Sequence, residues 1–256
     1  MTRGMKSLFM LVALSASVSV LAQPDIENIK TQAEAGDVSA QLLLGMMFGM
    51  GSGVEADEKE EAKWFRLAAD QGNADAQAFL GNMYYFGRGV EKSYDDALNW
   101  YCLAAAQGNA GAQSSLGLMH SRGEGVEPSD TQAYGWFELA ARQGDSTAQF
   151  HLAEYFRRGV AVAQNDQEAV KWYRLAALQG NALAQLNLGL SYFHGMGVAQ
   201  SVSKAYLWFA VAEAQGESLG SEGTDIMHYR ISIKARDRAQ AQAIRCLSSN
   251  YLDCEE

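Results

Sequence analysis

Ser201 and Lys204 have the Ser-x-x-Lys spacing of the serine enzymes that react with β-lactams, in which a lysine lies beside the nucleophilic hydroxyl. That chemistry also requires a Ser-Asp-Asn-type element and a Lys-Thr-Gly strand. The sequence predicts no strand, and Ser201 stands where a helix is expected to begin, a position that favours serine as an N-cap. We therefore predict a structural role for this pair and no catalytic residues in the chain.

The histidines offer no metal site. No two of them have the HxxxH spacing that would place two histidine ligands together on one helix. They are His120, His151, His194 and His228. We therefore predict neither a metal ion nor another cofactor.

Two of the three cysteines are close enough in sequence to form a disulfide. Eight residues of continuous helix would hold Cys246 and Cys254 about 12 Å apart, which is too far for a bond. The residues 248–250, Ser-Ser-Asn, can end a helix and let the chain fold back. We therefore predict a Cys246–Cys254 bridge, and we expect Cys102 to be a lone, packed thiol.

Glycine pairs of the form Gly-x-Gly could suggest a phosphate-binding loop, which needs a preceding strand and a basic partner. Here each pair is expected to follow a helix, and the pair recurs along the chain, at Gly51, Gly87, Gly123 and Gly195. These pairs are therefore interpreted as turns between helices. The fourth copy reads Gly159-Val-Ala161, so we expect its turn to be distorted.

The whole stretch 37–216 repeats with a period of 36 residues, without insertions. Three dipeptides define the period, and each occurs five times: Ala-Gln from Ala40, Trp-aromatic from Trp64, and Gln-Gly from Gln71. A fixed period of this size indicates a stacked repeat architecture, which presents extended surfaces rather than active-site pockets.

Each copy predicts two helices. The first follows a glycine and an Asp or Asn N-cap, such as Gly36-Asp37, and ends at the glycine of the turn, such as Gly51. Its apolar residues recur at helical spacing, and a small residue beside them favours a close helix–helix approach. The second helix begins at Asp57 or its equivalents, and we expect its tryptophan to lie in the core.

The repeated pattern A-x-x-x-L-G-x-x-Y-x-x-G-x-G-V, followed by K-A-x-x-W-Y-x-x-A-A-x-x-G, resembles the Sel-one-like repeat family, a relative of the tetratricopeptide repeats. The resemblance implies an all-α, right-handed α-solenoid of helix-turn-helix repeats that acts as a scaffold for protein–protein contacts. Secreted bacterial members include envelope scaffolds and cysteine-rich proteins that bind penicillin. This chain lacks the regular cysteines of the latter group.

The first residues predict a secretory signal peptide, with Arg3 and Lys6 before an apolar run and cleavage after Ala22. Retention of the run as a membrane anchor is the alternative. The predicted parts are the signal peptide at 1–22, an N-terminal capping helix at 23–36, five repeats at 37–216, and a C-terminal cap at 217–256, with a helix at 225–247. We expect a periplasmic or secreted protein without membrane insertion after cleavage.

The mature chain is acidic. Removal of the signal peptide leaves 20 − 2 = 18 basic residues against 30 acidic ones, a net charge of −12. A chain of this charge without a basic stripe argues against binding to nucleic acid or to anionic lipid. The partner we expect is another protein or peptide segment.

Such a partner is predicted to bind where the copies differ, along one face of the first helices. By resemblance to tetratricopeptide solenoids, this face lines the concave surface. It is apolar in the N-terminal copies and basic in the C-terminal ones. The candidate residues are Leu43, Met50, Phe79, Asn82, Phe86, Arg122, His151, Arg158, Asn187 and His194.

Three alternatives remain open. The apolar members of this face could merely pack between adjacent helices. The protein could instead bind peptidoglycan or β-lactams, with weak β-lactamase-like hydrolase activity. It could also be a secreted host-interacting factor of the same fold.

Overall fold

The computed structural model describes residues 26–216, 220, 222–225 and 231–254, so the predicted signal peptide lies outside the described residues. Within these ranges the chain is all-helical, without a strand, and consecutive helices pack as antiparallel pairs. The helices are α1 (Ile26–Glu34), α2 (Val38–Met50), α3 (Glu58–Asp70), α4 (Ala74–Phe86), α5 (Tyr94–Ala106), α6 (Ala110–Arg122), α7 (Asp130–Arg142), α8 (Ser146–Arg158), α9 (Asp166–Ala177), α10 (Ala182–His194), α11 (Val202–Glu213) and α13 (Ile233–Ser248). In the described part of the chain, no helix is long and apolar enough to cross a bilayer.

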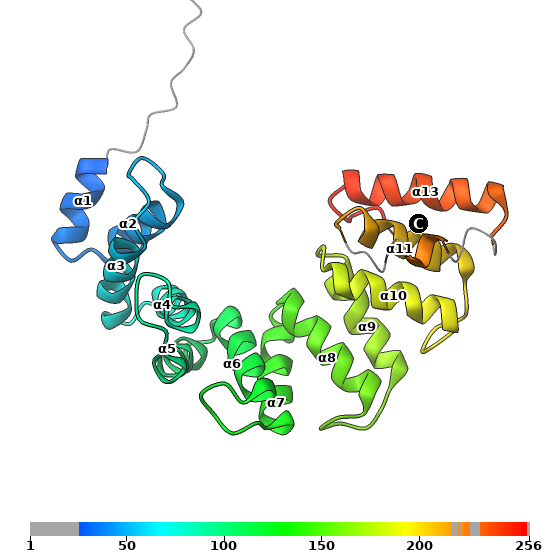
Figure 1. The fold of residues 1–256 in the computed structure, drawn as a ribbon, viewed down its shortest axis with the longest axis horizontal. Coiled ribbons are helices and arrows are strands. Elements are labelled where there is room, and N and C mark those ends of the chain that lie inside the picture. The colour runs from blue at the N-terminus through cyan, green and yellow to red at the C-terminus, as the bar shows by residue number, and fades with distance from the viewer. Residues whose placement is uncertain (1–25, 217–219, 221, 226–230, 255–256) are drawn as a thin grey trace, which may run out of the picture.

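The helix pairs stack into a crescent-shaped solenoid (Figure 1). The first helices of the middle copies, α4 and α6, lie along its inner edge, and their partners α5 and α7 lie along the outer edge. The predicted all-α solenoid of five repeats is confirmed.

The helix boundaries follow from local capping. The carboxylate of Asp37 accepts a hydrogen bond from the backbone N–H of Ala40 at 2.7 Å, and α2 ends where Gly51 adopts a left-handed conformation, with φ of 65°. These contacts satisfy backbone groups that the helix itself leaves unpaired. The same cap recurs at Asn73, Asn109, Asp145 and Asn181, and the second helices begin at Asp57, Ser93, Ser129, Asn165 and Ser201.

The fourth turn keeps its left-handed residue, contrary to the expected distortion. Ala161 takes a φ of 59°, close to the 64° of Gly89 at the equivalent position. A side chain with a Cβ is strained in this region, so the repeat geometry is retained at a local conformational cost.

The core of each repeat is organised around the aromatic residue that follows the tryptophan. Tyr101 is 2% exposed, and a Cβ placed at Gly81 would lie 2.7 Å from its ring. The glycine therefore permits the close approach of α4 and α5 that the sequence predicts. The tryptophans themselves are less uniform than expected, since Trp64 and Trp208 are buried but Trp100 and Trp136 are half-buried. Each of the latter two packs on the core shared by its own copy and the preceding one.

Buried glutamines connect neighbouring copies. The side-chain amide of Gln77 donates to the carbonyl of Ala69 at 3.1 Å, while its oxygen accepts from Gln107 at 2.8 Å. Both the nitrogen and the oxygen of this buried amide therefore have a hydrogen-bond partner within the stack. The same pair of bonds recurs at Gln41, Gln113, Gln149 and Gln185.

The two ends of the solenoid are covered. Helix α1 packs on α2, and α13 packs on α11, where the hydroxyl of Tyr206 donates to Gln240 at 3.1 Å. The helix predicted for 225–247 is wrong at its start, because α13 begins at Ile233 after the N-cap Ser232. A disulfide joins Cys246, in the last turn of α13, to Cys254 beyond the end of the helix, and both cysteines are fully buried.

A candidate partner-binding groove on the first helices

Two hollows lie side by side over the first helices. The first, of about 380 Å³, is lined by Met46, Gly49, Met50, Glu61, Phe65, Phe79, Asn82, Met83 and Arg88. The second, of about 430 Å³, is lined by Asp75, Ala78, Phe79, Asn82, Tyr101, Asn109, Gly111, Ser114, Ser115, Leu118, Asp145 and Thr147. Because both include Phe79 and Asn82 of α4, they form one groove that crosses α2, α4 and α6. We call these residues the first-helix groove.

Large apolar side chains are left exposed in this groove and next to it, on the same helices. Phe79 is 38% exposed even though its ring stacks on Phe65 at a centroid distance of 5.1 Å. Met50 and Phe86, which end their helices at equivalent positions, are 68% and 65% exposed. Leu43 is also exposed, one turn before Met46 on α2. An exposed group of apolar side chains next to hollows is typical of an interaction surface.

Three of the candidate residues are already engaged inside the chain. Asn82 accepts a hydrogen bond from the hydroxyl of Tyr101 at 2.7 Å, although it still lines both hollows. The ring of His151 stacks on Phe137 at 4.8 Å, and burial lowers the pKa of this imidazole. Asn187 donates to the carbonyl of Leu183 in the preceding turn of α10 at 2.8 Å. Their polar groups are therefore less available to a partner than the sequence indicates.

Two arginines supply positive charge further along the inner side. Arg122 ends α6, is exposed, and donates to the hydroxyl of Tyr85 at 3.1 Å. That hydroxyl in turn donates to Glu124 at 2.7 Å, and burial together with this bond raises the pKa of Tyr85. Arg158 ends α8 and is exposed. His194, also exposed, occupies the same position on α10.

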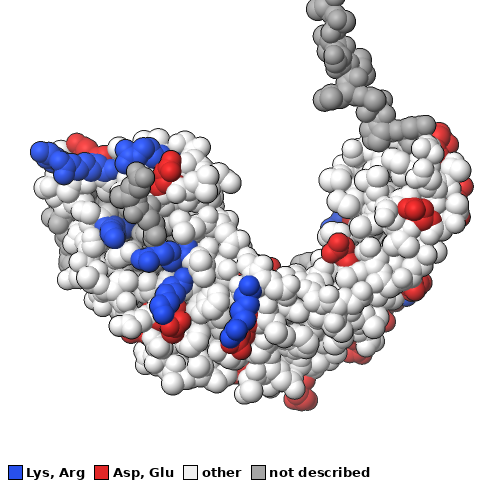
Figure 2. All heavy atoms as spheres, turned by 180° about the vertical axis from the view of Figure 1, so that it is seen from behind, with Lys and Arg blue, Asp and Glu red and all other residues white. Residues whose placement is uncertain are grey.

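Glu154, an acidic residue on the predicted binding face of α8, is neutralised by its neighbours. Glu154 accepts hydrogen bonds from Arg157, at 2.6 Å for the closer contact, and from the hydroxyl of Tyr173. Burial raises the pKa of this carboxyl, but the bonds from Arg157 and Tyr173 outweigh it and hold the pKa below its ordinary value. The charge of Arg158 is therefore not cancelled by Glu154. In Figure 2 basic side chains gather on the C-terminal arm of the crescent, and the N-terminal arm shows mainly acidic ones.

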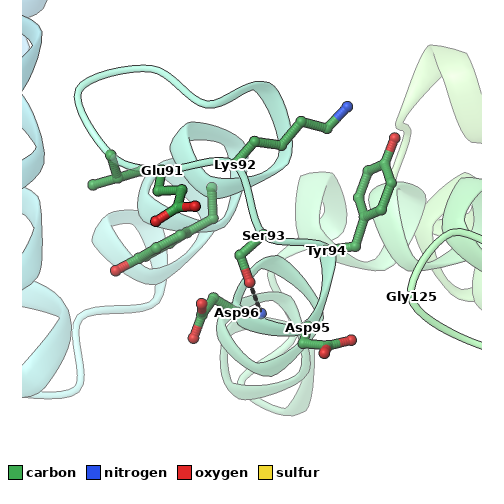
Figure 3. A pocket seen from close by; sticks show the side chains of 9 residues that line it. Glu91, Lys92, Ser93, Tyr94, Asp95, Asp96 and Gly125 are labelled. Carbon is green, nitrogen blue, oxygen red and sulfur yellow. Dashed lines mark hydrogen bonds between the residues drawn. The ribbon is translucent and has the colours of Figure 1, made fainter.

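A further hollow, of about 790 Å³, lies beside the turn between α4 and α5 (Figure 3). Its polar groups serve the local structure. The hydroxyl of Ser93 accepts from the backbone N–H of Asp96 at 3.1 Å as the N-cap of α5, and the ammonium of Lys92 lies 4.5 Å from the centre of the Tyr94 ring. We assign no ligand to this hollow.

The residues that could have been reactive have structural surroundings. The hydroxyl of Ser201 accepts from the backbone N–H of Lys204 as the cap of α11, and the ammonium of Lys204 lies over the ring of Tyr192. Cys102 is exposed on α5 rather than packed, and partial burial raises the pKa of its thiol. Within the described ranges no three His, Cys, Asp or Glu side chains gather as a metal site would require. His228 lies outside these ranges.

Some lining residues are not among the candidates taken from the sequence. Asp75 and Leu118 lie on the same helical faces as the candidates Phe79 and Arg122, one turn away from them. The ion pair between Glu61 and Arg88, at 3.0 Å, joins different copies across the rim of the first hollow. Its members are far apart in the repeat pattern, and no local spacing relates them.

The model of the Sel1 repeat matches the chain five times, over residues 38–73, 74–109, 110–145, 146–181 and 182–217. These units begin one residue after the boundaries expected from the sequence. No curated protein matches the chain.

Solved structures include close counterparts of this solenoid. A Sel1 repeat protein from Oxalobacter formigenes is 34% identical, with a TM-score of 0.71 over 77% of this chain and 57% of that one. The chain thus spans little more than half the length of that protein. A Sel1 repeat protein from Klebsiella pneumoniae is 24% identical, with a TM-score of 0.51 over 79% of this chain and 99% of its own, and shows the likeness of fold alone.

Proposed function

The chain belongs to the Sel1 repeat family, whose members mediate protein–protein interactions, and we propose that it is an exported, non-catalytic scaffold of the bacterial envelope. Its partner is a segment of another protein that binds along the first-helix groove. Export is supported by the sequence of residues 1–22, which has the charge and hydropathy pattern of a signal peptide.

The observation that carries the proposal is the pair of hollows that share Phe79 and Asn82. Exposed apolar side chains around them, Met50 and Phe86 among others, would be removed from water by a bound segment. Burying a side chain of this kind contributes about 1.5–3 kcal/mol, which makes a few such contacts sufficient for specific binding.

Charge gives the bound segment a direction. Its apolar residues would lie over α2 and α4, and acidic residues would lie near Arg122 and Arg158 on α6 and α8. Surface charges of this kind contribute more to the rate and orientation of binding than to its strength. The bound segment is therefore expected to be apolar at one end and acidic at the other.

A comparison of matched surface variants tests this proposal. Met50→Glu with Phe79→Glu would place two charges in the groove, whereas Leu103→Glu with Leu139→Glu would place two on exposed positions of the second helices. Affinity capture from the envelope fraction, quantified against the unmodified protein, should lose specific partners only with the first pair. Equal loss with both pairs, or with neither, at unchanged helicity would contradict binding in the groove.

The β-lactam alternative receives no support from Ser201 and Lys204. Because the Ser201 hydroxyl caps α11 and the lysine ammonium lies over an aromatic ring, the two are not arranged as a nucleophile and its base. Turnover of a chromogenic cephalosporin by the purified protein would overturn this assignment.

A further inference from the structure

The methionines of this protein differ sharply in exposure, and the difference is concentrated at the groove. Met50 is 68% exposed and Met46 is 37% exposed, whereas Met47, Met83 and Met119 are 3% exposed or less. The two exposed thioethers stand one helical turn apart on α2, and both line the smaller hollow. Thioether oxidation depends on access of the oxidant to the sulfur, so the exposed pair differs in reactivity from the buried set.

From this contrast we propose that Met46 and Met50 form a reversible oxidation site that controls binding in the first-helix groove. In the reaction, a peroxide transfers one oxygen atom to the thioether sulfur. The sulfur loses two electrons and becomes a sulfoxide, and hydrogen peroxide leaves as water. A dithiol used by a methionine sulfoxide reductase returns the two electrons, giving the thioether, a disulfide and water. The inference rests on the proposed function, because it concerns regulation of the same groove.

The chemical change matters because of what surrounds the two sulfurs. Their hollow also contains Phe65, Phe79 and the buried Met83, so its floor is apolar. In the free protein a sulfoxide at either exposed position is hydrated. A bound apolar segment would strip that water from the sulfoxide without supplying a hydrogen-bond donor, which opposes binding.

The charged residues at the rim do not remove this penalty. Glu61 and Arg88 line the same hollow, but the guanidinium of Arg88 is occupied by Glu61 and by Glu58, each at 3.0 Å. These bonds use two of its five N–H groups, and the ion pairs hold the other three beside two carboxylates, whose negative charge opposes the approach of a sulfoxide oxygen. We therefore expect oxidation to weaken the binding of an apolar ligand about tenfold.

Oxidation is measured first, without any ligand. The full chain carrying ¹³C-methyl methionine is treated with hydrogen peroxide, and each methyl signal is followed by NMR, with assignment by single Met→Leu variants. The Met50 and Met46 signals should convert to sulfoxide signals before those of Met47, Met83 and Met119. Equal rates at exposed and buried positions, with the fold intact by circular dichroism, would overturn the proposal whatever the groove binds.

Binding is measured next with a defined probe, the apolar anion 8-anilinonaphthalene-1-sulfonate. In the unmodified protein the probe should shift the Met46 and Met50 methyl signals, and peroxide should weaken its binding about tenfold. Treatment with a methionine sulfoxide reductase and dithiothreitol should restore it. The Met46→Leu, Met50→Leu protein should bind the probe equally well before and after peroxide, because leucine preserves the apolar surface and cannot be oxidised.

A matched control uses Met196, a half-buried methionine in the turn between α10 and α11, outside the groove. Met196→Leu should leave the peroxide effect unchanged. Probe binding that is insensitive to oxidation of Met46 and Met50 would overturn the switch. If the probe shifts neither methyl signal in the unmodified protein, the groove itself is not an apolar binding site, and the proposed function fails together with its regulation.

Discussion

The hydroxyl of Tyr101 on α5 donates a 2.7 Å hydrogen bond to the side-chain oxygen of Asn82 on α4. The same bond joins Tyr173 to Glu154 two copies later. Where the buried aromatic residue is phenylalanine, the partner position is apolar, as in Phe65 with Met46, Phe137 with Leu118 and Phe209 with Leu190. Polar and apolar pairs thus alternate along the solenoid.

This alternation predicts the result of a double-mutant cycle at Tyr101 and Asn82. Tyr101→Phe should lower the free energy of unfolding by about 1–2 kcal/mol, because Asn82 loses its partner in a half-buried place. Adding Asn82→Leu should recover most of the loss, since the double variant reproduces the pair found at Phe137 and Leu118. Urea denaturation of the four proteins measures the coupling. Additive effects of the two changes would contradict it.

A second prediction concerns the strained turn of the fourth copy. Ala161→Gly should raise the free energy of unfolding by about 0.5–1 kcal/mol, because glycine adopts φ of 59° without a Cβ clash. The control is the reverse change at Gly89, where a Cβ would lie 1.9 Å from the carbonyl oxygen of Glu58. Gly89→Ala should be destabilising by about 2 kcal/mol or more. Thermal and urea denaturation give both values, and a less stable Ala161→Gly protein would contradict the assignment of strain.

The glutamine contacts between copies give a third prediction. Gln113 is buried, donates to the carbonyl of Ala105 at 3.2 Å and accepts from Gln143 at 2.7 Å. Gln113→Leu should lower stability by about 1–2 kcal/mol, because the buried bond to the carbonyl of Ala105 is lost, whereas Gln143 is exposed and can bond to water instead. Gln132→Leu, at an exposed position of α7, is the matched control and should have little effect. A similar urea midpoint for the two variants would show that the glutamine contacts between copies contribute nothing to stability.

The fourth prediction is a pH dependence centred on His151. Burial lowers the pKa of this imidazole below its ordinary 6.5, the charge of Arg122 lowers it further, and Glu154 and Asp145 oppose the shift. Below about pH 6.5 the unfolded chain therefore binds a proton that the folded chain does not. The free energy of unfolding consequently decreases as the pH is lowered below about 6.5. His151→Phe keeps a ring on Phe137 and should flatten the pH dependence of unfolding between pH 7 and 5.

An NMR titration of His151 in the folded protein provides the direct check. Its midpoint should lie below that of the same residue in the urea-unfolded chain. His120, whose pKa burial also lowers, is present in both proteins, so the difference between their profiles isolates His151. A midpoint at or above the unfolded value would contradict the shift.

Much of the fold could be predicted from the sequence because its determinants are local. The N-cap at Asp37 and the left-handed glycine at Gly51 act within one turn of their own helix. Their recurrence every 36 residues makes the helix boundaries visible in a single sequence. The start of α13 was missed because it lies outside the repeats, where no second copy reveals the cap at Ser232.

The groove was only partly predictable, because variation between copies has two physical sources. Phe79 and Phe86 differ from their equivalents and are exposed, as a binding surface requires. Asn82 also differs, but its change is matched to the hydroxyl of Tyr101, 19 residues away on the adjacent helix. Likewise, the oxygen of Gln77 meets Gln107 at a separation of 30 residues. Such pairings depend on how helices stack, which helical periodicity alone does not determine.

Site-specific photo-crosslinking in the native organism tests most directly whether a partner lies in the first-helix groove. A benzoyl-phenylalanine replaces Met50 or Phe79 in the groove, or Leu103 or Leu139 on the second helices, and all four of these positions are exposed. Irradiation should give a discrete protein adduct from the two groove positions and none from the other two. Adducts formed equally at all four positions, or only from Leu103 and Leu139, would contradict binding along the inner side of the crescent.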